Sequence, residues 1–368
     1  MSLSELHIAG YRSIRELRCP LGSVNVIVGA NGVGKTNLYR AMYLLHAGAN
    51  GQLARTLADE GGMPSVLWAG SRRDGPVRFT LGVTIDPLEY QISCGLPNVP
   101  AGQTQFVLDP LVKDERVSVR ERGRRVVLME RGNLSAIVRD VEGAKVPYPV
   151  SLDPAESLLS QLADPHRYPE LSALRQEFLS WRFYHQFRTD PESPLRQPQI
   201  GVRTPVLSHD GRDLAAALRT IEEIGQGPAL HAAISEAFPG SRLVIEASDA
   251  RFQILLHVPG IQRPLDAREL SDGTLRYLCL AAALLSPRPP RMLALNEPET
   301  SLHPDLLVPL GVLIADAGKR SQVWVTTHAE ALARSITMSA GVEPLPLVKR
   351  GGATEIARTR VEHDADDE

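Results

Sequence analysis

Short β-branched runs and helical patterns follow one another along this chain, most clearly near its start. Residues 24–28 read V-N-V-I-V, a run typical of a strand buried in a parallel sheet. Leu38, Met42 and Leu45 recur at the spacing of one helix face, which predicts a helix over residues 36–47. A glycine-rich segment separates the two patterns, so the sequence predicts a strand, a loop and a helix in direct succession.

The rest of the first half is predicted to form mainly strands. We expect strands over residues 3–8 and 14–17, a hairpin of 77–85 with 89–94, and a hairpin of 116–119 with 125–129. Residues 47–62 are rich in Gly, Ala and polar side chains and are predicted to be irregular, as is the segment 97–109. Residues 153–181 are predicted to be mostly helical from Asp153-Pro154 onward, and a proline-rich connector spans 191–205.

The second half changes to an alternating pattern. Two helices are expected in 210–238, broken at 225–228, then a hairpin of 243–246 with 252–257 and a last hairpin within 345–358. From Leu270 the order becomes helix, strand, helix, strand, helix, with apolar strands at 292–295 and 323–326. This alternation favours an α/β fold whose parallel sheet is covered on both faces. Residues 363–368 form an acidic tail that is expected to be solvated.

Composition narrows the class of protein without identifying a partner. The chain has 368 residues, 43% of them hydrophobic and 23% charged, with a net charge of −3, as in ordinary globular proteins. With this net charge, the protein as a whole has no excess of positive charge that would attract nucleic acid. Three widely spaced cysteines, no signal-peptide pattern and a longest apolar run of only 278–285 favour a cytoplasmic protein that does not enter a membrane.

The octamer after the first buried strand carries the strongest chemical motif. It reads G-A-N-G-V-G-K-T, the spacing G-x-x-x-x-G-K-[ST] of a phosphate-binding loop. Gly29, Gly32 and Gly34 allow the backbone to approach a ligand, so that its N–H groups converge on phosphates at the start of a helix. Lys35 is expected to reach the β- and γ-phosphates of ATP, and the Thr36 hydroxyl to hold Mg²⁺. The alternative is a plain glycine-rich turn.

Three further segments extend this motif. Residues 292–304 read M-L-A-L-N-E-P-E-T-S-L-H-P, a strand that ends where a P-loop ATPase places a metal-supporting carboxylate and a water-activating glutamate. Glu297 fills the second place, whereas Asn296 fills the first and offers Mg²⁺ a neutral oxygen only. Ser271 precedes an apolar helix, as a cap or an anion site, and His328 ends an apolar strand. The alternatives are that the acidic residues of 292–304 occur there by chance, that Ser271 only caps its helix, and that His328 has a structural role.

The order of these four segments resembles ABC-type ATPases. G-A-N-G-V-G-K-T, L-S-D-G-T, L-N-E-P-E-T-S-L-H-P and T-T-H are similar to their Walker A, signature, Walker B with D-loop, and switch-histidine motifs. G-Y-R-S-I and E-P-E-T-S-L-H-P further resemble the RecF, SMC and OLD-like branch, which includes AAA_21-like predicted ATPases. The resemblance covers residues 1–46 and 265–340 and implies a homodimer closed around two ATP molecules.

The resemblance also assigns roles to individual residues. It implies water activation by Glu297, γ-phosphate sensing by His328, and Mg²⁺ binding by Thr36 and Asn296. It implies that one subunit contacts the nucleotide through Arg12, Gly29, Asn31, Gly32, Val33, Gly34, Lys35, Thr36 and Asn37, and the other through Ser271 and Gly273. The chain departs from the family pattern at Asn296, lacks a clear Q-loop glutamine, and shows neither a long coiled coil nor a nuclease domain. Gln52, Gln91 and Gln186 are the candidates for the Q-loop.

We therefore expect an α/β P-loop ATPase head of the ABC type, with a mostly parallel core sheet, an antiparallel β lobe and a helical insertion. Residues 1–150 and 241–368 are expected to form its two halves, with the insertion at 151–240. The expected function is an ATPase in DNA maintenance or anti-phage defence; the alternatives are a non-hydrolytic ATP switch that controls an effector protein and, least favoured, a transporter subunit. The segment 113–131 carries a net charge of +3, which indicates either phosphate contacts with DNA or a solvated strand edge.

Overall fold

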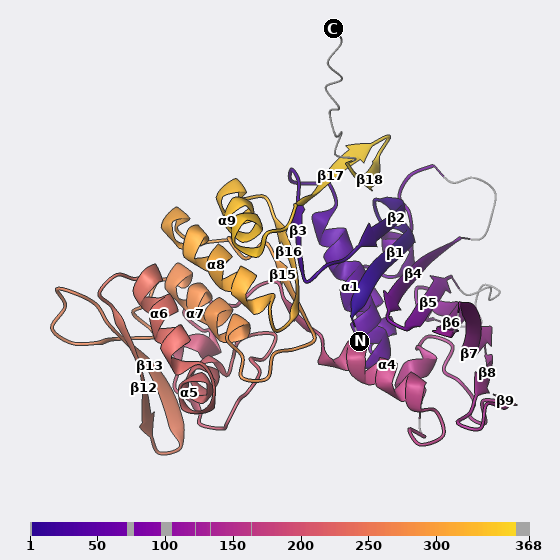
Figure 1. Ribbon diagram of the computed structural model, residues 1–368, viewed down its shortest axis with the longest axis horizontal. Coiled ribbons are helices and arrows are strands. Elements are labelled where there is room, and N and C mark those ends of the chain that lie inside the picture. The colour runs from indigo at the N-terminus through magenta and orange to yellow at the C-terminus, as the bar shows by residue number, and fades with distance from the viewer. Residues whose placement is uncertain are drawn as a thin grey trace, which may run out of the picture.

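The computed structural model describes residues 2–71, 77–96, 105–121, 123–132, 134–162 and 164–357. A six-stranded sheet runs through the middle of the molecule, between two lobes (Figure 1). In spatial order its strands are β10 (Arg182–Tyr184), β15 (Met292–Asn296), β16 (Gln322–Thr327), β3 (Val24–Val28), β17 (Leu345–Arg350) and β18 (Ala353–Ile356). The first five are parallel, and β18 pairs antiparallel with β17. The early strand β3 therefore lies between two strands formed by residues after 320.

Side chains alternate across this sheet into two separate hydrophobic cores. Met292 and Ala294 of β15 face one core, together with Trp324 of β16. Leu293 and Leu295, one position along, face the other core. Successive strand residues point to opposite faces, so an uninterrupted apolar run is what a sheet covered on both sides requires.

The first core is closed by an antiparallel sheet and four helices, in the lobe at the right of Figure 1. The sheet has the strand order β2-β1-β4-β5-β6-β7-β8-β9. Its strands are β1 (Leu3–Tyr11), β2 (Ile14–Pro20), β4 (Arg78–Ile85), β5 (Leu88–Gly95), β6 (Leu111–Glu121), β7 (Arg124–Gly132), β8 (Ser135–Arg139) and β9 (Lys145–Pro147). The helices are α1 (Lys35–Ala49), α2 (Leu53–Asp59), α3 (Met63–Val66) and α4 (Pro169–Ser180), with a short 3₁₀ turn, η1 (Leu158–Gln161).

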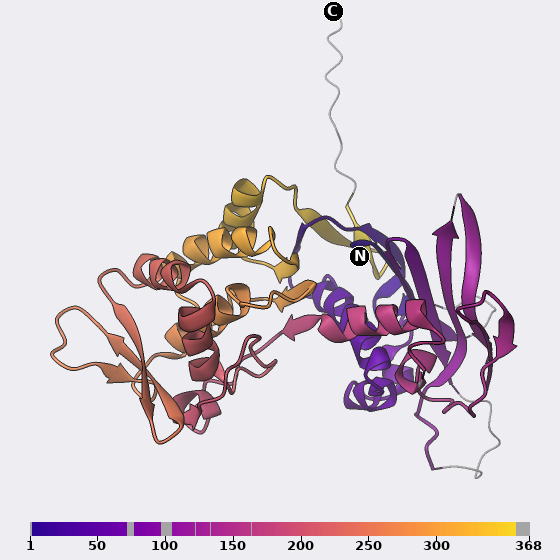
Figure 2. The ribbon, with the colours of Figure 1, turned by 60° about the horizontal axis from the view of Figure 1, so that its bottom comes forward.

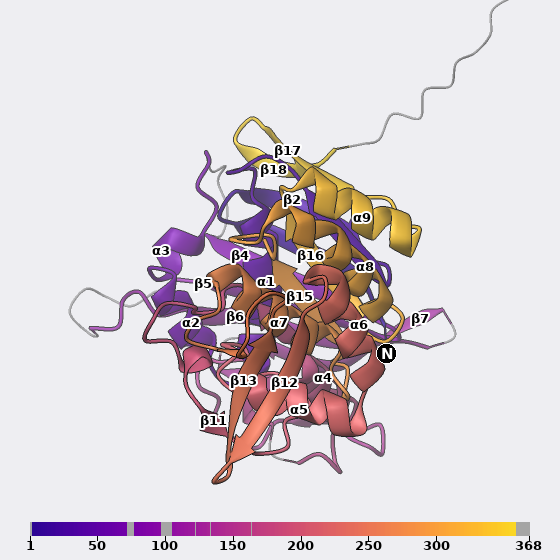
Figure 3. The same ribbon diagram turned by 90° about the vertical axis from the view of Figure 1, so that its left-hand side faces the viewer.

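The second core is covered mainly by helices, and Figure 2 shows this lobe extending away from α1. Its helices are α5 (Leu214–Ile224), α6 (Gly227–Ala237), α7 (Asp272–Leu284), α8 (Leu307–Ala317) and α9 (Glu330–Ala340). Strands β11 (Gln199–Ile200), β12 (Arg242–Ser248), β13 (Arg251–His257) and β14 (Leu265–Asp266) form a small sheet, seen in front in Figure 3, and η2 (Pro194–Arg196) and η3 (Pro304–Leu306) are 3₁₀ turns.

The predicted hairpins, the two helices of 210–238 and the alternating second half are confirmed, but two expectations are wrong. Residues 47–62 are not irregular, because α1 continues to Ala49 and α2 follows. The first N–H groups of α2 bond to the carboxylate of Glu156, 3.1 Å from Leu53 N and from Ala54 N. The described residues of 153–168 contain no α-helix, since Glu115 and Arg131 bond backbone groups of this segment instead.

Some sequence predictions fall outside the residues that the structure describes. Others concern the cysteines and membrane-spanning helices. The predicted tail 363–368 and residues 97–104 of the predicted loop lie outside the described residues. Cys19, Cys94 and Cys279 are buried and form no disulfide. Within the described residues, no helix is long and apolar enough to cross a membrane.

Candidate nucleotide-binding site

Three of the four predicted motifs meet at one edge of the core sheet. Strands β10, β15, β16 and β3 are parallel neighbours, so their carboxyl ends lie side by side. His185 follows β10, Asn296 ends β15, and His328 follows β16. The glycine-rich loop follows β3. In sheets of this kind, ligands bind outside the carboxyl ends of the strands.

The glycine-rich loop has the shape that a phosphate group requires. Gly34 has φ = 112° and Gly32 has φ = 77°, conformations that favour glycine. A side chain on Gly34 would place its Cβ only 2.2 Å from Thr354 Oγ1. The ammonium of Lys35 is buried and donates to the carbonyl oxygens of Gly29, at 2.7 Å, and of Ala30, at 3.2 Å. The loop therefore surrounds a buried cation, as binding of a polyphosphate demands.

A cluster of hydroxyl groups supports this loop from the last hairpin of the sheet. Thr354 of β18 is fully buried, and its hydroxyl donates to Val33 O at 2.7 Å. The same hydroxyl lies 2.7 Å from Ser13 Oγ, which also accepts from Asn37 Nδ2 at 2.7 Å. Residues from both ends of the chain thus hold the loop in place.

Glu297 lies between the loop lysine and His328. Its Oε1 is 3.9 Å from Lys35 Nζ and 4.0 Å from His328 Nδ1. The residue adopts φ = 49°, a backbone conformation that is uncommon outside glycine. Strained backbone of this kind often accompanies functional sites, because surrounding contacts must hold it. Three residues predicted from three separate motifs are thereby brought together.

Asn296 is buried and fixed on both sides of its amide. Its Oδ1 accepts from Thr326 Oγ1 at 2.7 Å, and its Nδ2 lies 2.7 Å from His185 Nδ1. Burial and then the positive charge of Arg40 lower the pKa of His185, which favours the neutral ring. A neutral ring can accept the amide hydrogen at Nδ1.

The surroundings fit Mg²⁺ only when the cation is shared with a phosphate. The described residues contain no group of three or more His, Cys, Asp or Glu side chains that could hold a metal ion. Thr36 is the second residue of helix α1, directly after Lys35. Mg²⁺ commonly takes few protein ligands and completes its shell with phosphate oxygens and water, which suits a site of Thr36 and Asn296.

Arg12 is expected to contact the nucleotide, and in this structure its side chain is held by Glu60. Its guanidinium donates to Glu60 Oε2 from Nε at 3.0 Å and from Nη2 at 2.6 Å, and Tyr11 donates to the same oxygen at 2.8 Å. The neighbouring Ser13, rather than the Arg12 side chain, contacts the loop region in this structure.

The L-S-D-G-T segment lies in the helical lobe. As expected, Ser271 caps α7, accepting from Thr274 N at 3.1 Å. A Cβ on Gly273 would lie 2.8 Å from Ser301 O, so the start of α7 packs closely on the loop after β15. Arg196 holds the segment through Leu270 O, at 2.8 Å, and Asp272 Oδ1, at 2.6 Å. Figures 1 and 2 both place α7 in the opposite lobe from α1.

Sequence reasoning missed His185, Thr354 and Glu299, each of which contacts a predicted site residue. Of these three residues, the sequence could have indicated only His185. It follows a short aromatic strand and directly precedes Gln186, a candidate for the Q-loop. Among these candidates, Gln186 follows β10 at the carboxyl edge, whereas Gln52 precedes α2 and Gln91 lies within β5.

The basic segment 113–131 forms the predicted hairpin, but much of its charge is paired. Arg120 Nε and Arg125 Nη2 each lie 2.9 Å from a carboxylate oxygen of Glu89, and Arg116 pairs with Glu130. Arg122 lies outside the described residues. These pairs favour the solvated-edge interpretation over a continuous surface for phosphates.

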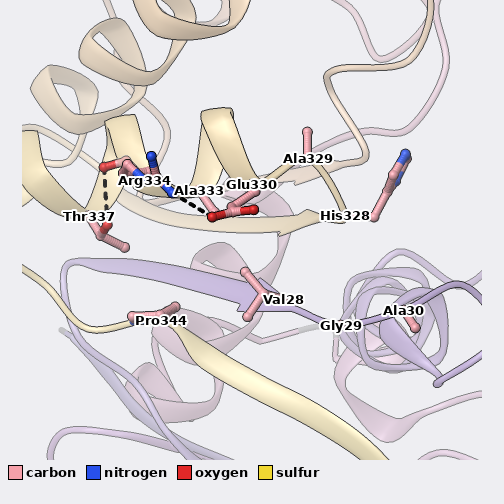
Figure 4. A pocket seen from close by; sticks show the side chains of 10 residues that line it. All are labelled: Val28, Gly29, Ala30, His328, Ala329, Glu330, Ala333, Arg334, Thr337 and Pro344. Atoms are coloured by element: carbon pink, nitrogen blue, oxygen red, sulfur yellow. Dashed lines mark hydrogen bonds and ion pairs between the residues drawn. The ribbon is translucent and has the colours of Figure 1, made fainter.

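A largely apolar pocket adjoins the start of the glycine-rich loop (Figure 4). Its volume is about 440 Å³, and it lies between the end of β3 and helix α9. Val28 and Gly29 form one wall, and Ala333 and Thr337 belong to the other. His328 is also among the residues that line the pocket, so the pocket adjoins the candidate site.

Comparisons with known proteins agree with this arrangement. Solved SMC heads share the fold at low identity: an SMC head bound to the C-terminal winged-helix domain of ScpA is 14% identical, with TM-score 0.55 and coverage of 97% of this chain and 98% of that one. An SMC head with an extended coiled coil, bound to the C-terminal domain of ScpA derived from Pyrococcus furiosus, is 14% identical, with TM-score 0.56 and coverage of 97% and 96%. A third, from Pyrococcus yayanosii, is 13% identical, with TM-score 0.50 and coverage of 97% and 96%.

The fold and motifs define an ABC-type ATPase head of the RecF and SMC-like branch. A sequence model described as "AAA domain, putative AbiEii toxin, Type IV TA system" matches residues 149–334, just over half of the chain. The chain belongs to this family. A second model, described as "AAA ATPase domain", matches residues 1–62. No curated protein matches the chain.

Proposed function

We propose that the protein is an ATPase whose two copies close around two ATP molecules. The observation that carries the proposal is the position of Glu297 Oε1, 3.9 Å from Lys35 Nζ and 4.0 Å from His328 Nδ1. Lys35 and the loop amides would hold the phosphates, and Thr36 and Asn296 would hold Mg²⁺. Bound Mg²⁺ would neutralise charge that develops on the phosphates. Glu297 orients and deprotonates a water molecule, and His328 contacts the γ-phosphate.

The position of Ser271 in the opposite lobe from the loop supports the proposed dimer. Its hydroxyl and the free N–H groups at the start of α7 suit an anion, which a second copy would present. Replacing Glu297 with Gln should stop hydrolysis and leave the copies closed, since bound ATP then favours the dimer by mass action. Light scattering should give twice the monomer mass for Glu297→Gln with MgATP, and one monomer mass with ADP or when Ser271→Arg is added. A single mass in all states would contradict the proposal.

We propose that the protein acts in DNA maintenance or anti-phage defence. Its partner would be DNA or a separate effector protein. The family description, which names a toxin–antitoxin system, supports the defence role. A second candidate is a long-lived ATP switch with little hydrolysis, favoured by the neutral and firmly held Asn296. Phosphate release from the wild-type protein with MgATP separates the two, because a switch would dimerise without releasing phosphate.

A further inference from the structure

A second glutamate of the same loop, Glu299, organises the segment that carries His328. One oxygen, Oε1, accepts hydrogen bonds from Thr327 Oγ1 at 2.6 Å, from His328 N at 2.9 Å and from Ala329 N at 3.3 Å. The side chain is buried, being only 5% exposed. A buried carboxylate is retained at such a position only when several donors compensate for its lost hydration.

The same oxygen also contacts the imidazole ring. His328 Nδ1 lies 3.1 Å from Glu299 Oε1 but 4.0 Å from Glu297 Oε1. The two atoms lie at the distance of an ion pair, and a hydrogen on Nδ1 makes the contact attractive, because a carboxylate oxygen only accepts. The other ring nitrogen, Nε2, then remains for a ligand, and the side chain is 44% exposed. Glu299 Oε2 has no hydrogen-bond partner among the described residues, so the carboxylate is committed to this one loop.

We propose that Glu299 is the positioning residue of His328, which fixes its backbone, its ring orientation and its tautomer. The inference rests on the proposed function, in which His328 contacts the γ-phosphate. Without Glu299, the ring can rotate and carry its hydrogen on Nε2, and fewer molecules present the ring correctly to the reacting phosphate. ATP binding depends on the glycine-rich loop instead, so it should change little.

The test compares Glu299→Ala with Glu299→Gln, whose amide oxygen can still accept from the loop. Glu330→Ala is the matched control, because Glu330 is an exposed acid near His328 whose one ion pair among the described residues is with Arg334. The His328 tautomer is measured by ¹⁵N NMR on histidine-labelled protein, with the resonance assigned through His328→Gln. We expect Nδ1–H in the wild-type, Glu299→Gln and Glu330→Ala proteins, and Nε2–H in Glu299→Ala.

Kinetics provide the second readout. Glu299→Ala should lower the kcat of ATP hydrolysis by at least about tenfold with KM within about threefold, as for other residues that orient a functional histidine. Glu299→Gln should recover most of that loss. An Nε2–H ring in the wild-type protein, or an unchanged tautomer in Glu299→Ala, would overturn the proposal even if one variant folds poorly. Absence of ATP binding by the wild-type protein would overturn the proposed function instead, while the tautomer still reports on Glu299.

Discussion

The amide nitrogen of Asn296 lies 2.7 Å from Nδ1 of His185, a nitrogen that the neutral ring offers as an acceptor. An aspartate at position 296 would place an oxygen there, and two acceptors would then face each other. The pair becomes favourable again only if His185 takes a hydrogen on Nδ1. The residue at the usual metal-supporting position is therefore matched to its histidine neighbour.

The first prediction concerns Asn296→Asp. The added charge should lower the Mg²⁺ concentration needed for half-maximal ATP hydrolysis by about tenfold, since two unit charges 4 Å apart interact by on the order of 1 to 4 kcal/mol outside the deep interior. The new carboxylate should also raise the pKa of His185, which burial now lowers, and NMR titration of the ring measures this directly. If neither quantity changes, Asn296 lies outside the metal site.

Lys35→Ala should lower ATP affinity by at least about tenfold, because a hydrogen bond to a charged group contributes about 1.5 to 3 kcal/mol. Calorimetry measures the affinity, and thermal unfolding checks that the fold is intact. Lys319→Ala is a control, since within the described part of the chain this exposed lysine forms an ion pair with Asp316 alone, on the surface of the helical lobe. Equal affinity in Lys35→Ala and wild-type protein would remove the central claim.

Thr354→Val should weaken the glycine-rich loop, because it leaves Val33 O and Ser13 Oγ without the buried hydroxyl. An unsatisfied buried polar group costs about 1 to 3 kcal/mol, so the free energy of unfolding in urea should fall by that amount. Thr354→Ser, which keeps the hydroxyl, should lose less stability and retain more ATP affinity. Identical behaviour of the two variants would show that the methyl group, not the hydrogen bonds, matters.

The basic hairpin gives a prediction about DNA. If it contacts duplex DNA, binding should weaken steeply with salt and show no sequence preference. Reversing the charges of Arg122, Arg124 and Arg125 should weaken it further. Because Arg125 is already paired with Glu89, we favour the other outcome, in which charge reversal changes binding little in fluorescence anisotropy at about 50 mM salt. A large loss of binding on charge reversal would instead assign the hairpin to a DNA interface.

The sequence predicted those strands, loops and helices whose own residues carry the signal. The run at 24–28, the octamer and the helix after it were predicted in order, because strand, loop and helix each carry their own spacing. Helix α2 was missed since its N-terminal donors are bonded by Glu156, a residue about a hundred positions away. No window of sequence around residue 53 contains that contact.

The residues of the candidate site likewise divide into those that a local motif predicts and those that only tertiary contacts reveal. Lys35, Glu297 and His328 could be named because each follows a strand or opens a helix within a recognisable motif. Glu299 belongs to the same motif as Glu297, yet its contact with His328 depends on how β15 and β16 are paired. Thr354 carries no motif, and only the return of the last hairpin to the loop reveals it.

The position of β3 has a consequence for synthesis of the chain on the ribosome. Both neighbours of this strand in the sheet, β16 and β17, are made roughly three hundred residues after it. Because domains emerge from the N-terminus first, the strand that leads into the phosphate loop stays unpaired until β16 and β17 have been made. Completion of the loop also waits for Thr354. The nascent protein should therefore gain its nucleotide pocket only after β16, β17 and β18 have been synthesised, so a product truncated before them would carry the motif without a folded pocket.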